Sequence, residues 1–113
     1  MRIIVVLLTV LLLGACASKP IQPTETVWLD VRSAQEFAAG HLPGAINIPH
    51  TEIVQGVAAL KLDKSSNIAL YCGSGRRAGI AIEALQQQGY SNLTNQGGYE
   101  SLKQKQLSAD ERQ

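Results

Sequence analysis

The chain alternates short apolar runs with segments of helical character, and this alternation constrains the fold more than any other feature of its 113 residues. Apolar runs bounded by turn residues predict strands over residues 27–31, 45–48 and 68–71, with a weaker strand over 91–95. Helices are expected over residues 33–40, 51–60, 78–88 and 99–105. Such alternation is typical of a parallel sheet that helices cover on both faces. The sequence therefore predicts an α/β fold around a central parallel sheet.

A cysteine follows the third expected strand directly, in the segment Tyr-Cys-Gly-Ser-Gly-Arg-Arg-Ala at residues 71–78. In parallel α/β sheets, ligands bind just beyond the carboxyl ends of the strands, which is where Cys72 falls. Backbone N–H groups of a glycine-rich turn can converge on the sulfur, and the following helix adds the positive end of its dipole. Such surroundings lower the pKa of a cysteine and favour the thiolate, which is the nucleophilic form.

The residues after Cys72 suit an anionic substrate. Basic side chains at a helix N-terminus oppose the helix dipole, so Arg76 and Arg77 indicate an anion that the sequence itself does not supply. Ordinary alternatives are a tight turn for the glycines, a solvated helix start for the arginines and inert, buried packing for the cysteine. An inert cysteine in an apolar core would be followed by apolar residues rather than by glycines and arginines, so the sequence favours a functional cysteine. The candidate substrate-binding residues are Gly73, Ser74, Gly75, Arg76, Arg77 and Ala78.

The beginning of the chain has the pattern of an export signal. Residues 1–15 combine a basic start, an apolar run and small residues, which is typical of a secretory signal peptide. Leu-Gly-Ala-Cys at residues 13–16 resembles the lipobox of bacterial lipoproteins, in which the cysteine is acylated. We therefore expect lipidation at Cys16 and a lipid-anchored protein of the bacterial cell envelope that faces the periplasm. Cleavage after Ala17, which would release a soluble periplasmic protein, is the alternative.

The chain is expected to consist of four parts. We expect a signal peptide of the lipoprotein type over residues 1–15, a polar tether over 16–24, one folded domain over 25–107 and a flexible tail over 108–113.

Composition argues against several classes of function. A net charge of +1 gives no basic surface for nucleic acid, and 4% aromatic residues leave few rings to stack on bases. With Cys16 acylated or removed, Cys72 is the only thiol left, and the missing Cys-x-x-Cys pair weakens the case for a dithiol oxidoreductase. One thiol with His41 and His50 forms no recognisable metal set, so we expect no metal.

Five segments of the chain resemble the rhodanese family of sulfurtransferases. Trp-Leu-Asp-Val-Arg at residues 28–32, Glu-Phe at 36–37 and Gly-His-Leu-Pro-Gly-Ala-Ile-Asn-Ile-Pro at 40–49 look like the family's N-terminal signature. The segment at residues 71–77 is similar to its active-site loop, and Asn-Gln-Gly-Gly at 95–98 to its closing segment. The resemblance covers roughly residues 25–107 and implies the three-layer rhodanese fold.

The resemblance also implies a reaction. Cys72 would attack the outer sulfur of thiosulfate, release sulfite and become a persulfide, and the sulfur would pass to cyanide or a thiol. Loop N–H groups would hold the persulfide, while Arg76 and Arg77 attract the sulfonate oxygens. No cofactor is required. Asp30 and Arg32 would give structural support, as an ion pair or through hydrogen bonds that brace the loop.

Two alternatives stay open. Phosphatases related to this fold carry five residues between cysteine and arginine, whereas here four residues separate Cys72 from Arg77, which favours sulfur over phosphate. The second alternative is a non-catalytic sulfur carrier or persulfide-binding module that serves a protein partner, and the intact loop fits it equally. Outside the loop, we expect Trp28 in the core, His41 in a structural hydrogen bond and His50 at the surface.

Overall fold

The computed structural model describes residues 25–111 of the chain. The expected signal peptide, the tether and the lipidation site at Cys16 lie outside the described residues and stay predictions. Within residues 25–111, no helix is long and apolar enough to cross a membrane.

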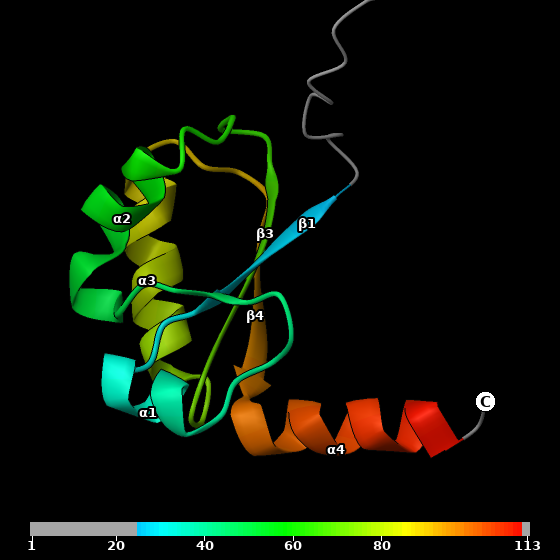
Figure 1. The fold of residues 1–113 in the computed structure, drawn as a ribbon. Helices are drawn as coiled ribbons and strands as arrows, with labels where there is room; N and C mark the ends of the chain where they lie inside the picture. Colours follow the sequence, from blue (N-terminus) through cyan, green and yellow to red (C-terminus); the bar gives the residue numbers. More distant parts are fainter. Residues whose placement is uncertain (1–24, 112–113) are drawn as a thin grey trace, which may run out of the picture.

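A single sheet of four parallel strands forms the centre of the molecule (Figure 1). Its order is β2-β1-β3-β4, so the first strand pairs with the second on one side and with the third on the other. The strands are β1 Thr26–Asp30, β2 Ile46–Asn47, β3 Asn67–Cys72 and β4 Leu93–Gly98. The helices are α1 Ala34–Ala39, the short 3₁₀ helix η1 His50–Glu52, α2 Ile53–Ala59, α3 Arg76–Gln87 and α4 Tyr99–Glu111. The predicted α/β fold with a parallel sheet is confirmed.

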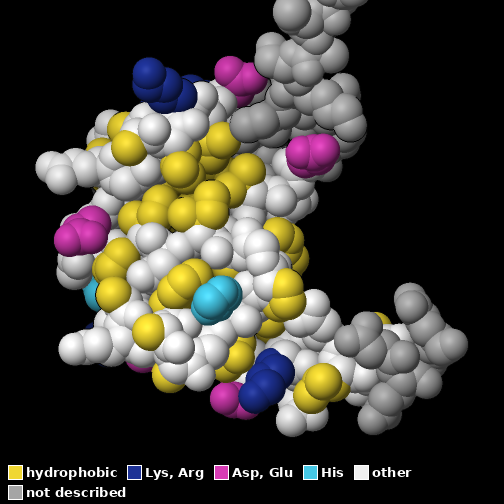
Figure 2. All heavy atoms as spheres, in the orientation of Figure 1, with side chains coloured by type: hydrophobic (Ala, Val, Ile, Leu, Met, Phe, Trp, Pro, Cys, Tyr) yellow, Lys and Arg dark blue, Asp and Glu magenta, His cyan; other side chains and the backbone are white. Residues whose placement is uncertain are grey.

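The main core lies between the sheet and the helices α2 and α3, which lie side by side on one face (Figure 1). Because successive strand residues point to opposite faces, Leu29 of β1 and Leu70 of β3 enter this core, and so does Val31, which directly follows β1. Val57 and Leu85 meet them from the two helices. Hydrophobic side chains also reach the surface between these helices and the strands (Figure 2), where partly buried residues pack against the core.

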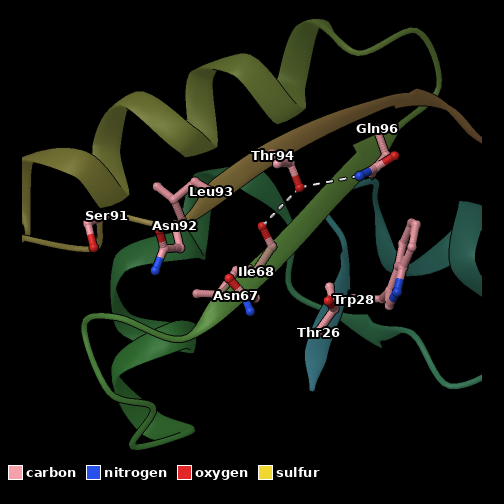
Figure 3. Close-up of a pocket in the computed structure, with 9 residues that line it drawn as sticks. All are labelled: Thr26, Trp28, Asn67, Ile68, Ser91, Asn92, Leu93, Thr94 and Gln96. Carbon is pink, nitrogen blue, oxygen red and sulfur yellow. Dashed lines mark hydrogen bonds between the residues drawn. The ribbon is translucent and has the colours of Figure 1, made fainter. Parts of the chain in front are cut away.

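The second face of the sheet is covered at its carboxyl end. The ring of Tyr99, the first residue of α4, stacks on Tyr71 of β3 with a centroid separation of 6.2 Å, and Leu102 of α4 lies across a groove from Trp28. Along β4 this face carries the polar side chains of Thr94 and Gln96, which are joined by a hydrogen bond of 3.3 Å (Figure 3). The predicted three layers, with helices on both faces, are present.

Trp28 does not lie in the core, as we had expected. It is half-buried and lines two grooves on the second face (Figure 3). Alternation along β1 explains the error, because Leu29 takes the core side and its neighbour must face the other way. His50 is likewise half-buried in η1 rather than exposed. His41 accords with its prediction, since its Nδ1 lies 2.9 Å from the Phe37 carbonyl oxygen and its ring stacks on Phe37.

Three predicted boundaries are wrong. Helix α3 begins at Arg76, two residues before the expected start, so both loop arginines belong to its first turn. Strand β4 runs to Gly98 rather than ending at residue 95. Helix α4 continues to Glu111, so residues 108–111 of the expected flexible tail are helical. The polar helix formers after residue 103 carry no apolar stripe that would have announced this extension.

Candidate active site

Cys72 is the last residue of β3, and its side chain is fully buried. The chain then turns through residues 73–75 and enters α3, of which Gly75 is the N-cap. This glycine adopts φ +91°, in the left-handed region that residues with a Cβ rarely enter. The turn brings its backbone N–H back to donate a hydrogen bond of 2.9 Å to the Cys72 Sγ. The predicted strand–loop–helix geometry around the sulfur is therefore present.

The environment of Cys72 favours the thiolate. Burial raises the pKa of this thiol, but hydrogen bonds from the backbone N–H groups of Ala78, Ser74, Gly75 and Arg77 lower it, and the net pKa lies below its ordinary value. Backbone amides at a helix N-terminus have no intrahelical partners, so they are free to bind an anion. The sulfur occupies that anion position.

We expect Cys72 to react with iodoacetamide at pH values where an ordinary thiol is largely protonated. Because its pKa is lowered, Cys72 keeps a larger thiolate fraction as the pH falls. The pH at which its alkylation rate is half-maximal should therefore be lower than the corresponding pH for glutathione. Rates measured by mass spectrometry across pH 5–10 would give both midpoints. The same protein in urea is the control, because unfolding removes the N–H groups and should return the midpoint to the ordinary value of about 8.5.

Arg77 already has an anionic partner in the chain. This corrects the expectation that the sequence supplies no anion for its guanidinium. Its Nη1 and Nη2 donate to Oε1 and Oε2 of Glu36, at 2.6 and 3.0 Å. This contact with Arg77 lowers the pKa of Glu36 to about 2 despite the opposing effect of its partial burial. Arg76 is exposed, and no hydrogen bond or ion pair to it appears among the residues that the structure describes. In the sequence, Glu36 stood out as part of the Glu-Phe pair of the signature, and no partner for its carboxylate was predicted.

The carboxyl end of β4 packs against the cysteine loop through Asn95, Gly97 and Gly98. The sequence analysis gave these three residues no individual role. Asn95 Nδ2 donates to the Gly75 carbonyl oxygen at 2.9 Å, and its Oδ1 accepts from the Gly97 N–H at 2.9 Å. Gly98 pairs with Cys72 after an irregularity in the β3–β4 register. A Cβ on Gly98 would lie 2.6 Å from the Gly73 carbonyl oxygen. The pair of glycines at positions 97 and 98 was the signal that could have pointed to this close approach.

Gly98→Ala should therefore disturb the loop. Because the obstructing atom is backbone rather than a flexible side chain, the loop must shift, and misplacement of about 1 Å can cost about a hundredfold in rate. We expect the alkylation midpoint of Cys72 to rise and any turnover to fall by at least about tenfold. Gly79→Ala is the matched control, since a Cβ there meets only Asn95 Nδ2 at 3.7 Å and alanine favours the α3 helix. Equal behaviour of the two variants would contradict the proposed packing.

Asp30 and Arg32 form the predicted ion pair, and both side chains are almost completely buried. Arg32 Nη2 donates to Asp30 Oδ2 at 2.7 Å and also to the Gly40 carbonyl oxygen at 2.7 Å. Its guanidinium carbon lies 4.3 Å from the centroid of the Tyr99 ring. The pair thus joins β1 to the end of α1 and the start of α4. No hydrogen bond joins the pair directly to residues 72–77 in the described part of the chain, so its support of the loop stays a prediction.

The sequence matches the Rhodanese-like domain family over residues 15–105. The chain belongs to the rhodanese family. This agrees with the resemblance in the signature segments and with the parallel sheet that presents the cysteine at its carboxyl edge.

Curated relatives of this rhodanese include sulfurtransferases. It is 37% identical over 75 residues to the thiosulfate sulfurtransferase PspE of Escherichia coli, a match that covers 66% of this chain and 72% of the relative. It is 31% identical over 79 residues to the thiosulfate:glutathione sulfurtransferase of Saccharomyces cerevisiae, covering 60% of this chain and 57% of that enzyme. These relatives support a sulfurtransferase enzyme.

Solved structures give the same grouping. A rhodanese with anions from E. coli superposes with a TM-score of 0.64 at 37% identity, over 67% of this chain and 89% of that one. The human single-domain sulfurtransferase TSTD1 superposes with a TM-score of 0.59 at 30% identity, over 66% of this chain and 76% of that one. The fold of the described residues is thus the single-domain rhodanese fold.

Proposed function

We propose that this rhodanese transfers a sulfane sulfur from thiosulfate to a thiophilic acceptor through a persulfide on Cys72. The observation that carries the proposal is the position of the Cys72 sulfur, which is buried at the carboxyl edge of the sheet and accepts backbone hydrogen bonds from the loop and from α3. A thiolate held in this way is a nucleophile, and the same donors suit the charged persulfide that would replace it. The names of the relatives supply thiosulfate as the donor to test.

The reaction takes place in two displacements. In the first, the Cys72 thiolate attacks the outer sulfur of thiosulfate, a new S–S bond forms, and the S–S bond of the donor breaks with its electron pair leaving on sulfite. The enzyme then carries a persulfide anion with the same charge as the original thiolate. In the second, cyanide or a thiolate attacks the terminal sulfur, and the electron pair of the S–S bond returns to Cys72. Such covalent catalysis predicts ping-pong kinetics.

Arg76 and Arg77 at the start of α3 have different roles toward an anionic donor. Arg76 is exposed at the first position of α3, where a donor's sulfonate oxygens can reach a guanidinium that no carboxylate occupies among the described residues. Arg77 lies closer in, against Glu36 and the loop. Gly73 and Ser74 are exposed beside the sulfur and Ala78 is buried behind it, and the backbone N–H groups of Ser74 and Ala78 help to lower the pKa of Cys72.

Mass spectrometry of the protein after incubation with thiosulfate tests the proposal. We expect the mass of one added sulfur atom, located on Cys72 by peptide mapping, together with one equivalent of sulfite. Addition of cyanide should remove the extra mass and, with excess thiosulfate, produce thiocyanate over many turnovers. A persulfide that forms once and is not turned over by cyanide or small thiols would replace the enzyme by a sulfur carrier. Absence of any adduct on Cys72 would overturn both.

A further inference from the structure

Glu36 has two separate sets of contacts in the structure. As the third residue of α1 it completes a capping box, in which the Ser33 Oγ accepts from the Glu36 N–H at 3.2 Å and the Glu36 Oε1 accepts from the Ser33 N–H at 3.3 Å. The same carboxylate accepts both hydrogen bonds from the guanidinium of Arg77. The two residues are 41 positions apart in the chain, so this contact joins α1 to the first turn of α3.

The guanidinium that Glu36 holds also lies against the cysteine loop. A Cβ placed on Gly73 would come within 3.2 Å of Arg77 Nη2, so this side chain folds back over the residue that follows the nucleophile. Both Glu36 and Cys72 contribute to the raised pKa of Arg77, first through the hydrogen bond from Arg77 to Glu36. One positive charge is therefore shared between a carboxylate and the site of the sulfur.

The charge on Glu36 is not needed to cap α1. A capping box works with glutamine as well as with glutamate at this position, because only a side-chain oxygen has to reach the backbone N–H. A carboxylate adds a full negative charge beside a site that we propose to receive anions. Its side chain is 39% exposed and that of Arg77 31%, so solvent weakens this charge without removing it.

We propose that Glu36 is a specificity-determining residue that limits the preference of this site for doubly charged donors, by neutralising Arg77 beside the cysteine loop. The inference rests on the proposed sulfur transfer. With Glu36 present, the charges of the thiolate, Glu36, Arg76 and Arg77 balance to zero, so a dianion gains little over a monoanion. Without the carboxylate the site carries one net positive charge and favours the dianion.

The other ionisable groups near the loop do not alter this balance. Arg32 interacts with Glu36, but its charge is cancelled by that of its buried partner Asp30. Strand β4 carries no ionisable side chain. Tyr71 of β3 is neutral, because its burial is the main cause that raises its pKa to about 12. His41, after α1, is exposed and directs Nδ1 to the Phe37 carbonyl oxygen.

Glu36→Gln is the decisive variant, because glutamine keeps an oxygen for the Ser33 cap and for Arg77 while it removes the charge. We expect the KM for thiosulfate, a dianion, to fall about threefold, as suits a half-exposed charge. The KM for methanethiosulfonate, a monoanion, should fall by less, and kcat for both donors should stay within about twofold. The difference between donors should shrink at 0.5 M salt, since screening weakens interactions between exposed charges.

Ser33→Ala is the matched control, because it removes the cap and leaves the Arg77–Glu36 pair in place. It should lower the Tm and leave the ratio of the two KM values unchanged. Donor preference that changes equally in Ser33→Ala and Glu36→Gln would make Glu36 a purely structural residue and overturn the proposal. An unchanged KM ratio in Glu36→Gln would do the same.

A second measurement does not require sulfur transfer. The pH midpoint of Cys72 alkylation should fall by about 0.5 in Glu36→Gln, because the freed positive charge of Arg77 stabilises the thiolate more strongly. If the wild type forms no persulfide but this midpoint still falls, the proposed function fails while the electrostatic role of Glu36 stands. A midpoint that stays the same or rises would contradict that role whatever the reaction.

Discussion

Cys72→Ser should abolish sulfur transfer, with a loss of at least about a thousandfold in turnover, because a hydroxyl at neutral pH is not ionised and cannot form a persulfide. Loss of thiocyanate production and of the thiosulfate-dependent mass increase would both be measured. Serine is slightly smaller than cysteine and can accept the same backbone hydrogen bonds, so the loop should keep its conformation.

The structural integrity of that variant needs its own measurement. Circular dichroism and thermal unfolding should match the wild type closely, since the hydroxyl oxygen meets the N–H donors that the sulfur meets now. A folded Cys72→Ser protein that still gains sulfur from thiosulfate would show that the nucleophile lies elsewhere. An unfolded one would show that the sulfur is needed for packing, contrary to the view that backbone geometry sets the loop.

Arg32→Met should lower the free energy of unfolding by about 3–5 kcal/mol, the usual cost of removing one partner of a buried ion pair. Asp30 is fully buried, and without the guanidinium its carboxylate has no charged partner among the described residues, although the backbone N–H of residue 32 and the Tyr71 side chain still contact it. The Gly40 carbonyl oxygen loses its donor as well. Urea unfolding followed by circular dichroism measures the change.

Removing both charges tests whether the unpaired carboxylate causes the loss. The double variant Asp30→Leu/Arg32→Met should recover part of the stability, because apolar replacement of a whole buried pair is often close to neutral. A single variant as stable as the wild type would contradict the importance of the pair. A double variant less stable than the sum of the single changes would show that the two side chains matter mainly for packing.

Much of the fold could be predicted from the sequence because local signals agree with it. Each apolar run that predicts a strand does form one, and the capping box of Ser33 and Glu36 marks the start of α1. The run before Cys72 enters the core on every other residue, and the glycines after it allow the turn that the sulfur requires. Periodicity and turn chemistry are local properties, so a sequence displays them directly.

Apart from the three element boundaries, the errors concern where side chains lie relative to distant segments. Nothing near Glu36 in the sequence indicates that its carboxylate binds Arg77, and its local role as a cap already explains its presence. Trp28 was misplaced for a related reason, since its size suggests the core while its position in β1 directs it to the second face. Such outcomes depend on which elements meet in space, and that information is distributed over the whole chain.

The tight contact between Gly98 and Gly73 has a consequence for biosynthesis. The loop can be finished only after β4, which is made well after Cys72, has docked beside β3. A growing polypeptide that has emerged only as far as α3 has the backbone N–H donors of residues 74–78, but it lacks the Asn95 side chain that binds the Gly75 carbonyl oxygen. The sulfur would therefore reach its full reactivity late in synthesis, once β4 has docked beside β3 and fixed the loop.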